Sequence, residues 1–163
     1  MRPGGKQDKE TAMNDVLTMD AITDPHILPV GDVLARTLYG EARGEGLPGI
    51  EAVACVILNR VAFAKARGRY WWGNTVSQVC LKPGQFSCWN AGDPNRAKLL
   101  KLSARDPAYR LCKRVATRAL AGEIADMTQG ATHYHTHAVD PYWARGQVPV
   151  AEIGGHVFYR GIG

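Results

Sequence analysis

A glutamate, Glu41, lies where the helical pattern of residues 30–43 calls for an apolar side chain. Counted at about 100° per residue, Glu41 falls in the same arc as Val33, Leu34 and Leu38. Burial among apolar neighbours disfavours a carboxylate anion, and so does the negative end of a helix. We therefore expect Glu41 to have a raised pKa.

A carboxyl group that stays protonated near neutral pH is a candidate general acid, the device with which glycosidases protonate a leaving oxygen. The alternative is an acid at a cleft edge that pairs with an arginine, such as Arg60 or Arg145, and takes part in no reaction. Most glycosidases also need a second carboxylate across the scissile bond. Glu45 would lie beside Glu41 rather than opposite it, and spacing singles out none of the remaining acids, Glu51, Asp126, Asp140 and Glu152. A mechanism with one acid is therefore worth considering.

The motif HYHTH, residues 133–137, raises a different chemistry. On a strand, its three histidines share a face, and a neighbouring pair could bind zinc with Asp140 as a third ligand. All three cannot easily reach one ion, because the outer two would be about 13 Å apart in a regular strand. A zinc-dependent amidase or peptidase is the alternative enzyme. We prefer to interpret these histidines as hydrogen-bonding groups of a cleft wall.

The length and composition of the chain fit one ordinary domain. It has 163 residues, 45% of them hydrophobic and 21% charged, and its longest apolar run, Ala52–Leu58, is too short to cross a bilayer. Residues 1–27 lack the apolar core of a signal peptide, so we expect a flexible arm before a domain of residues 28–163. Synthesis in the cytoplasm without stable membrane insertion follows. The four cysteines are expected to be buried thiols, with a Cys80–Cys88 disulfide as the alternative.

The charge balance favours an anionic partner. The formal net charge is +5, which suits nucleic acid, a membrane surface or an acidic wall polymer. The basic residues are spread widely, and no helix-turn-helix, zinc-finger or RNP pattern accompanies them, so we expect no nucleic-acid partner. A wall-binding module without catalysis is a third hypothesis.

Caps and prolines predict a series of helices. Asp32 is the expected cap of the first helix, and Pro48 suits the first turn of the second, which is apolar on nearly every side and so belongs at the centre of the fold. Asp93 and Asp106 each precede a proline, a signature of helix starts. The expected helices are 32–43, 48–64, a short one within 74–80 that leads into a loop or short strand, 95–102 and 108–121.

The remainder of the chain changes to a strand-like pattern. Residues 131–139 have the composition of a strand, and residues 148–160 form two short runs joined by Gly154 and Gly155, a hairpin signal. Helices followed by a small antiparallel sheet predict an α+β domain.

Four stretches together resemble the SleB-type cell-wall hydrolases, the group of spore cortex-lytic enzymes and their bacterial and phage relatives. They are LARTLYGEARGEGLPGIEAVACVILNRV, TVSQVCLKPGQFSCWN, ATHYHTHAVDPYWARG and EIGGHVFYR, in family order from about Asp32 to Arg160. The resemblance implies a lysozyme-like, lytic transglycosylase-related fold that acts on peptidoglycan glycan strands. It implies no metal and no other cofactor.

The resemblance also implies a role for Glu41, the first acid of the family's E-A-R-G-E motif. This glutamate protonates the bond between N-acetylmuramic acid and N-acetylglucosamine, and the muramoyl C6 hydroxyl then closes on C1 to leave a 1,6-anhydro end. That chemistry needs no carboxylate nucleophile, in agreement with the lack of an obvious second acid.

A glycan groove needs aromatic platforms together with amide or hydroxyl donors. The loop and strand regions that the resemblance places around the cleft supply both, with Tyr142 and Asn90 nearby and with Trp71 and Trp72 unassigned. The substrate-binding residues expected are Gln85, Phe86, Ser87, Trp89, Thr132, Tyr134, His135 and Trp143.

Spore enzymes of this family carry an N-terminal peptidoglycan-binding domain and a signal peptide, and neither is visible in this sequence. The chain therefore looks more like a phage or prophage endolysin, or a virion-associated wall hydrolase. We expect a monomer that is made in the cytoplasm and reaches the wall with the help of a holin or injection machinery.

Overall fold

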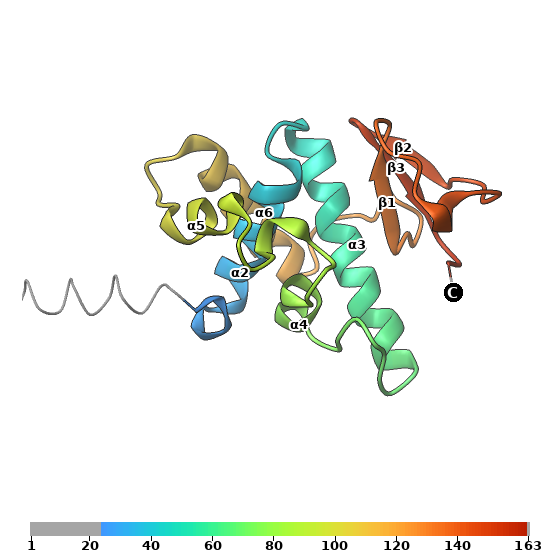
Figure 1. Cartoon of the computed structure of the whole chain (residues 1–163), viewed down its shortest axis with the longest axis horizontal. Helices are drawn as coiled ribbons and strands as arrows, with labels where there is room; N and C mark the ends of the chain where they lie inside the picture. The colour runs from blue at the N-terminus through green and yellow to red at the C-terminus, as the bar shows by residue number, and fades with distance from the viewer. Residues whose placement is uncertain (1–23, 163) are drawn as a thin grey trace, which may run out of the picture.

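Two packed helices, α2 (Val30–Ala42) and α3 (Gly46–Ala66), organise the domain. The computed structural model describes residues 24–162. Figure 1 shows α3 running through the middle of the domain, with the other helices on one side and the sheet on the other. By length and composition α3 could span a membrane, but most of it is buried within the domain, as expected for a central core helix.

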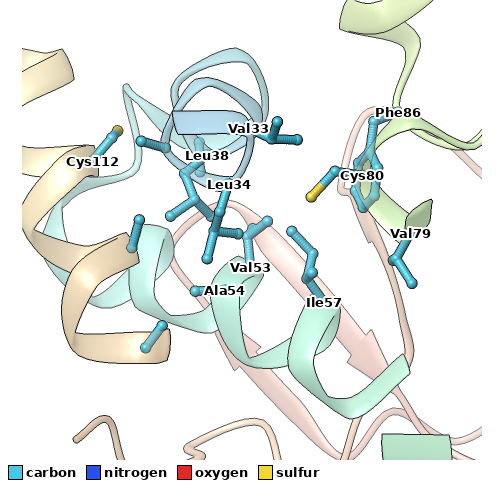
Figure 2. Packing of buried hydrophobic residues seen from close by; sticks show 14 of the residues in the cluster. Val33, Leu34, Leu38, Val53, Ala54, Ile57, Val79, Cys80, Phe86 and Cys112 are labelled. Atoms are coloured by element: carbon cyan, nitrogen blue, oxygen red, sulfur yellow. The ribbon is translucent and has the colours of Figure 1, made fainter. Parts of the chain in front are cut away.

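The main core lies between α2, α3 and α6 (Pro107–Leu120). Leu34 and Leu38 of α2 face Val53 and Ile57 of α3, and Cys112 of α6 closes another side of the cluster (Figure 2). The short helix α4 (Val76–Leu81) covers the core near Phe86. Burial of these side chains fixes α2 against α3, and therefore fixes the place of any residue at the end of α2.

Most of the predicted helix starts are confirmed. Thr75 caps α4 by accepting a hydrogen bond from the backbone N–H of Gln78, and Asp93 and Asp106 cap α5 (Pro94–Lys101) and α6. The prediction that Asp32 caps the first helix is wrong. The helix begins at Val30, so Asp32 lies in its first turn, where a negative charge is still favourable, and its carboxylate pairs with Lys113 at 3.3 Å.

The three strands form an antiparallel sheet in the order β1-β3-β2. The strands are β1 (His133–Thr136), β2 (Ala151–Ile153) and β3 (His156–Tyr159). The predicted β2–β3 hairpin is confirmed, and Gly154 in its turn has a φ of 59°, which favours glycine. Phe158, directly opposite Tyr134 in the register, packs against α3. The expected α+β fold is therefore confirmed.

Other local predictions have mixed outcomes. The segment expected as a loop or short strand after α4 contains a 3-10 helix, η3 (Ser87–Trp89). All four cysteines are buried and free, so the expectation of buried thiols is confirmed. Most of the predicted arm, residues 1–23, lies outside the described residues, and its end forms a short 3-10 helix, η2 (Pro25–Ile27).

Candidate active site

A cavity of about 350 Å³ lies where the end of α2 meets α3, the loop after α4 and strand β1. Glu41 is the one acid that lines it among the described residues. Six of the predicted substrate-binding residues line it too: Gln85, Phe86, Ser87, Tyr134, His135 and Trp143. We call this cavity the catalytic cleft.

The Glu41 carboxyl group is held from two sides. The hydroxyl of Tyr134 donates a hydrogen bond to its Oε2 at 3.0 Å, and the thiol of Cys88 donates to its Oε1 at 3.6 Å. Burial raises the pKa of Glu41, although these two hydrogen bonds and the charge of Arg60 act in the opposite direction. The predicted direction of the pKa shift is therefore confirmed, with desolvation as its main cause.

Tyr134 is itself fixed and stays protonated. Burial and the neighbouring Glu41 raise the pKa of its phenol well above 10.0. Its ring packs against His156 and Phe158, with ring centroids 4.8 and 5.7 Å apart. Tyr134 therefore keeps a hydroxyl proton that it can donate to Glu41 at neutral pH, and its position is set by β3.

Arg60 of α3 contributes a buried cation to the cleft. Its Nε donates to the carbonyl of Thr132 at 2.7 Å, and its Nη1 donates to Oε1 of Gln85 at 3.4 Å. The guanidinium also lies over the rings of Trp72 and Phe86, 5.3 and 5.5 Å from their centroids. Arg60 thus joins α3 to both the start of β1 and the loop after α4.

The ion pairs considered for Glu41 do not form. Within residues 24–162, Glu41 makes no salt bridge with Arg60, and Arg145 instead pairs with Asp140 at 3.3 Å. The five acids considered as a second carboxylate are all engaged elsewhere. Glu45 accepts from Gly155 N at 2.6 Å, Glu51 pairs with Arg118 at 3.1 Å, Asp126 accepts from Asn59 and Thr128, Asp140 pairs with Arg145, and Glu152 pairs with His137 at 2.7 Å.

A family model described as Cell Wall Hydrolase matches residues 44–159, which begin just after Glu41. The chain belongs to the SleB-type cell wall hydrolase family.

Individual relatives point the same way. The chain is 33% identical over 131 residues to a spore cortex-lytic enzyme of Bacillus cereus, a match that covers 78% of this chain and 43% of that protein. It is 32% identical over 129 residues to a spore cortex-lytic enzyme of Halalkalibacterium halodurans, covering 77% of this chain and 33% of that one. The chain thus spans less than half the length of these curated relatives.

Two solved structures share the fold. The catalytic domain of the germination-specific lytic transglycosylase SleB from Bacillus anthracis aligns with a TM-score of 0.61 at 29% identity, covering 80% of this chain and 93% of that domain. The catalytic domain of the Bacillus cereus SleB protein aligns with a TM-score of 0.61 at 28% identity, covering 80% and 89%.

Two of the expected substrate-binding residues of this cell wall hydrolase lie outside the catalytic cleft. Trp89 is 5% exposed and donates its indole N–H to Oγ1 of Thr37 at 2.9 Å, so it belongs to the core. Thr132 is buried, and its carbonyl accepts from Arg60. Oγ1 of Thr132 lies 2.9 Å from Nδ1 of His133, so neither Trp89 nor Thr132 is placed on the cleft as expected from the sequence. Tyr142, also considered, is 86% exposed and does not line the cleft.

The three HYHTH histidines take separate partners. Burial lowers the pKa of His133 to about 4, and its ring packs between Trp72 and Trp143. Nε2 of His135 lies 3.0 Å from the hydroxyl of Tyr159, and His137 pairs with Glu152. Within residues 24–162, no three His, Cys, Asp or Glu side chains are grouped so that they could hold a metal ion.

Sequence reasoning missed two contributors to the cleft. Nothing in the spacing of the cysteines indicated that the Cys88 thiol would contact Glu41. Arg60 was considered only as an ion-pair partner. A cation among the apolar residues in the middle of α3 was the available signal, because a buried charge needs hydrogen-bond partners, which in this protein are the Thr132 carbonyl before β1 and Gln85 of the cleft.

Proposed function

We propose that this chain cleaves peptidoglycan glycan strands between N-acetylmuramic acid and N-acetylglucosamine as a lytic transglycosylase, with Glu41 as both general acid and general base. The observation that carries the proposal is the position of Glu41 as the one carboxyl group lining the catalytic cleft within the described residues, with a pKa raised by burial. The similarity to the catalytic domain of SleB, a germination-specific lytic transglycosylase of Bacillus anthracis, supports the same reaction.

In the first step, protonated Glu41 donates its proton to the glycosidic oxygen, and the bond from C1 of the muramoyl unit to that oxygen breaks. In the second step, the C6 hydroxyl of the same unit attacks C1. Its proton passes to the Glu41 carboxylate, and a 1,6-anhydro ring closes. No water is consumed, and Glu41 ends in the protonated state in which it began. One carboxyl group therefore suffices.

The neighbours of Glu41 fit the change of charge between the two steps. The hydroxyl of Tyr134 and the thiol of Cys88 both donate to the carboxyl oxygens. Such bonds become stronger when the acceptor is ionised, so they stabilise the transient anion left after the first step. Burial, in contrast, favours the protonated ground state. This balance lets one group serve as acid and then as base.

The other cleft residues are proposed to bind the sugar units. Trp143 and Phe86 supply apolar ring surface, and Gln85, Ser87 and His135 supply polar atoms on the same cavity. Flat sugar faces bordered by hydroxyl and acetamido groups match such a lining. In this proposal Glu41 transfers the proton, and the five other side chains hold the sugar units in place.

We propose the cell wall as the place of action, reached through a holin or injection machinery, with the chain acting as a monomer. The names of the relatives, which refer to lysis of the spore cortex, support a wall substrate. Expression in the host with and without a co-expressed holin tests delivery. Lysis should require the holin, and size-exclusion chromatography should give a monomer.

Digestion of purified peptidoglycan, with and without EDTA, tests the reaction. The released fragments, identified by mass spectrometry, should carry 1,6-anhydro ends in both conditions. Glu41→Gln should release them at a rate lower by about 10²–10⁴-fold. A gain of water at the sugar would indicate hydrolysis and overturn the transglycosylase step. Freed stem peptides that disappear with EDTA would indicate a metal-dependent amidase and overturn the proposal.

A further inference from the structure

A second cavity, of about 490 Å³, lies beside the catalytic cleft and has no part in the mechanism above. It is bordered by the turn before α4, by α4 and by the residues that follow α4. Its lining includes Arg69, Trp71, Asn74, Ser77, Gln78 and Lys82. We call it the Trp71 cavity. It combines an aromatic ring, amide and hydroxyl groups, and two cations on one concave surface.

Trp71 presents its indole to solvent at this cavity. The residue is 53% exposed, whereas the adjacent Trp72 is 1% exposed and belongs to the core. The Trp71 ring is nevertheless supported, because its centroid lies 5.7 Å from that of Trp72 and 6.2 Å from that of Tyr70. A supported but exposed aromatic ring beside polar groups is the arrangement that a sugar face requires.

Hydrogen bonds fix the turn that carries Trp71. The backbone N–H of Tyr70 donates to Oδ1 of Asn74 at 3.1 Å, and the backbone N–H of Asn74 donates to Oε1 of Gln78 at 2.9 Å. Gly73 has a φ of 105°, and a Cβ there would lie 2.7 Å from that of Gln78. The turn is therefore tightly packed on α4. With its oxygen used in the turn, Gln78 retains an NH₂ group as a donor toward the cavity.

The Trp71 cavity and the catalytic cleft are lined by neighbouring parts of the segment that follows α4. The lining of the first ends at Pro83 and that of the second resumes at Gln85, so only Gly84 separates them in the chain. Beneath the surface, packed rings also connect Trp71 with the cleft by way of Trp72, which is buried. Trp72 lies 5.9 Å from His133, which lies 5.1 Å from Trp143 of the cleft. Because the linings adjoin at residues 83–85, a linear polymer that leaves the cleft past Gln85 would meet this surface.

We propose that the Trp71 cavity is a distal subsite for the glycan strand, outside the catalytic cleft. The indole of Trp71 packs against a sugar face, and the NH₂ of Gln78 donates to an acetamido carbonyl. The cations of Arg69 and Lys82 meet the carboxylates of the stem peptide. This inference rests on the proposed function, because it takes peptidoglycan as the polymer in the cleft.

A binding assay tests the subsite apart from catalysis. In a Glu41→Gln background, Trp71→Ala should weaken binding to insoluble peptidoglycan stripped of wall teichoic acid by about tenfold, which is ~1.4 kcal/mol. Trp71→Phe keeps a ring and should retain most of the affinity. Met127→Ala is the matched control, because Met127 is 70% exposed outside both cavities and its removal should leave binding unchanged. Thermal unfolding should show every variant folded.

Turnover by the otherwise wild-type enzyme provides the second readout. Trp71→Ala should lower kcat/KM on long strands more than on short soluble fragments, mainly through KM. Unchanged affinity for stripped peptidoglycan would overturn the subsite, as would a loss seen only on walls that carry teichoic acid. If Trp71→Ala weakens binding while the wild type leaves glycosidic bonds intact, the proposed reaction fails and the binding site stands.

Discussion

Replacing Glu41 with glutamine should lower the rate of cleavage and raise the stability of the folded protein at neutral pH. The amide keeps the shape of the carboxyl group and one oxygen, which can accept from either Tyr134 or Cys88, while its NH₂ group faces the other, so one of the two hydrogen bonds is preserved as it stands. It has no transferable proton, and within the described residues no second acid lines the cleft to replace it. Cleavage should therefore fall by about 10²–10⁴-fold, the usual contribution of a general acid–base group, or ~3–5 kcal/mol in the barrier.

The same substitution should stabilise the folded protein at neutral pH. Burial raises the pKa of Glu41 above its ordinary value of 4.5. The stability that the wild type has below pH 4.5 is therefore lost as pH rises through the folded-state pKa, since the unfolded chain ionises more easily. Glutamine does not titrate, so the advantage of the variant over the wild type should grow through that window and then level off.

Both effects can be measured on the same two proteins. Release of anhydro-muropeptides, followed by mass spectrometry, gives the rate, and denaturant unfolding at several pH values gives the free energy of unfolding. Loss of activity together with a gain of stability would show that the buried Glu41 lowers the stability of the fold while its proton is needed for cleavage. A variant that retains activity within tenfold of the wild type would refute the role of Glu41. A variant whose relative stability is independent of pH would refute its burial.

Three other perturbations follow from the same contacts. Tyr134→Phe removes a donor that favours the Glu41 anion, so the pKa of Glu41 should rise further, and pH–rate profiles should show the loss of activity at high pH moved upward, together with a lower kcat. Gly40→Ala places a Cβ 2.7 Å from Sγ of Cys88 and should cost about 1–3 kcal/mol in denaturant unfolding, whereas Gly44→Ala, with nothing within 4 Å, should not. All four thiols are buried and have raised pKa values, so a thiol reagent at pH 8 should label them slowly until denaturant unfolds the chain; rapid labelling of the folded protein would contradict this burial.

Local signals explain which elements could be predicted from the sequence. The Asp–Pro pairs at 93–94 and 106–107 marked helix starts correctly, because the cap and the first-turn proline act within a few residues of each other. Asp32 was misassigned because an acid suits both the cap and the first turn of a helix. The two-glycine turn of the hairpin was clear for a similar reason, since its conformation is local.

The direction in which a side chain points is set by contacts far away in the sequence, and there the sequence was less informative. Trp89 and Trp143 looked alike as candidate sugar platforms. Only tertiary packing places the indole N–H of Trp89 on Thr37 within the core and leaves Trp143 on the cleft. Glu41 could be singled out because an acid in an apolar arc is an anomaly within one helix. Tyr134, 93 residues away, was predicted through the family resemblance as a substrate-binding residue, and its hydrogen bond to Glu41 was not predicted.

Arg60 places a cation near Glu41, the proposed acid, without forming an ion pair with it. A guanidinium paired directly with Glu41 would hold the carboxyl group as an anion, which has no proton to donate. Instead, its Nε donates to Thr132 and its Nη1 to Gln85, and its central carbon lies over the ring of Trp72. Burial lowers the pKa of Arg60, but a guanidinium remains charged at any physiological pH. The positive charge is therefore close enough to stabilise the transient Glu41 anion, while its hydrogen bonds hold the cleft walls together.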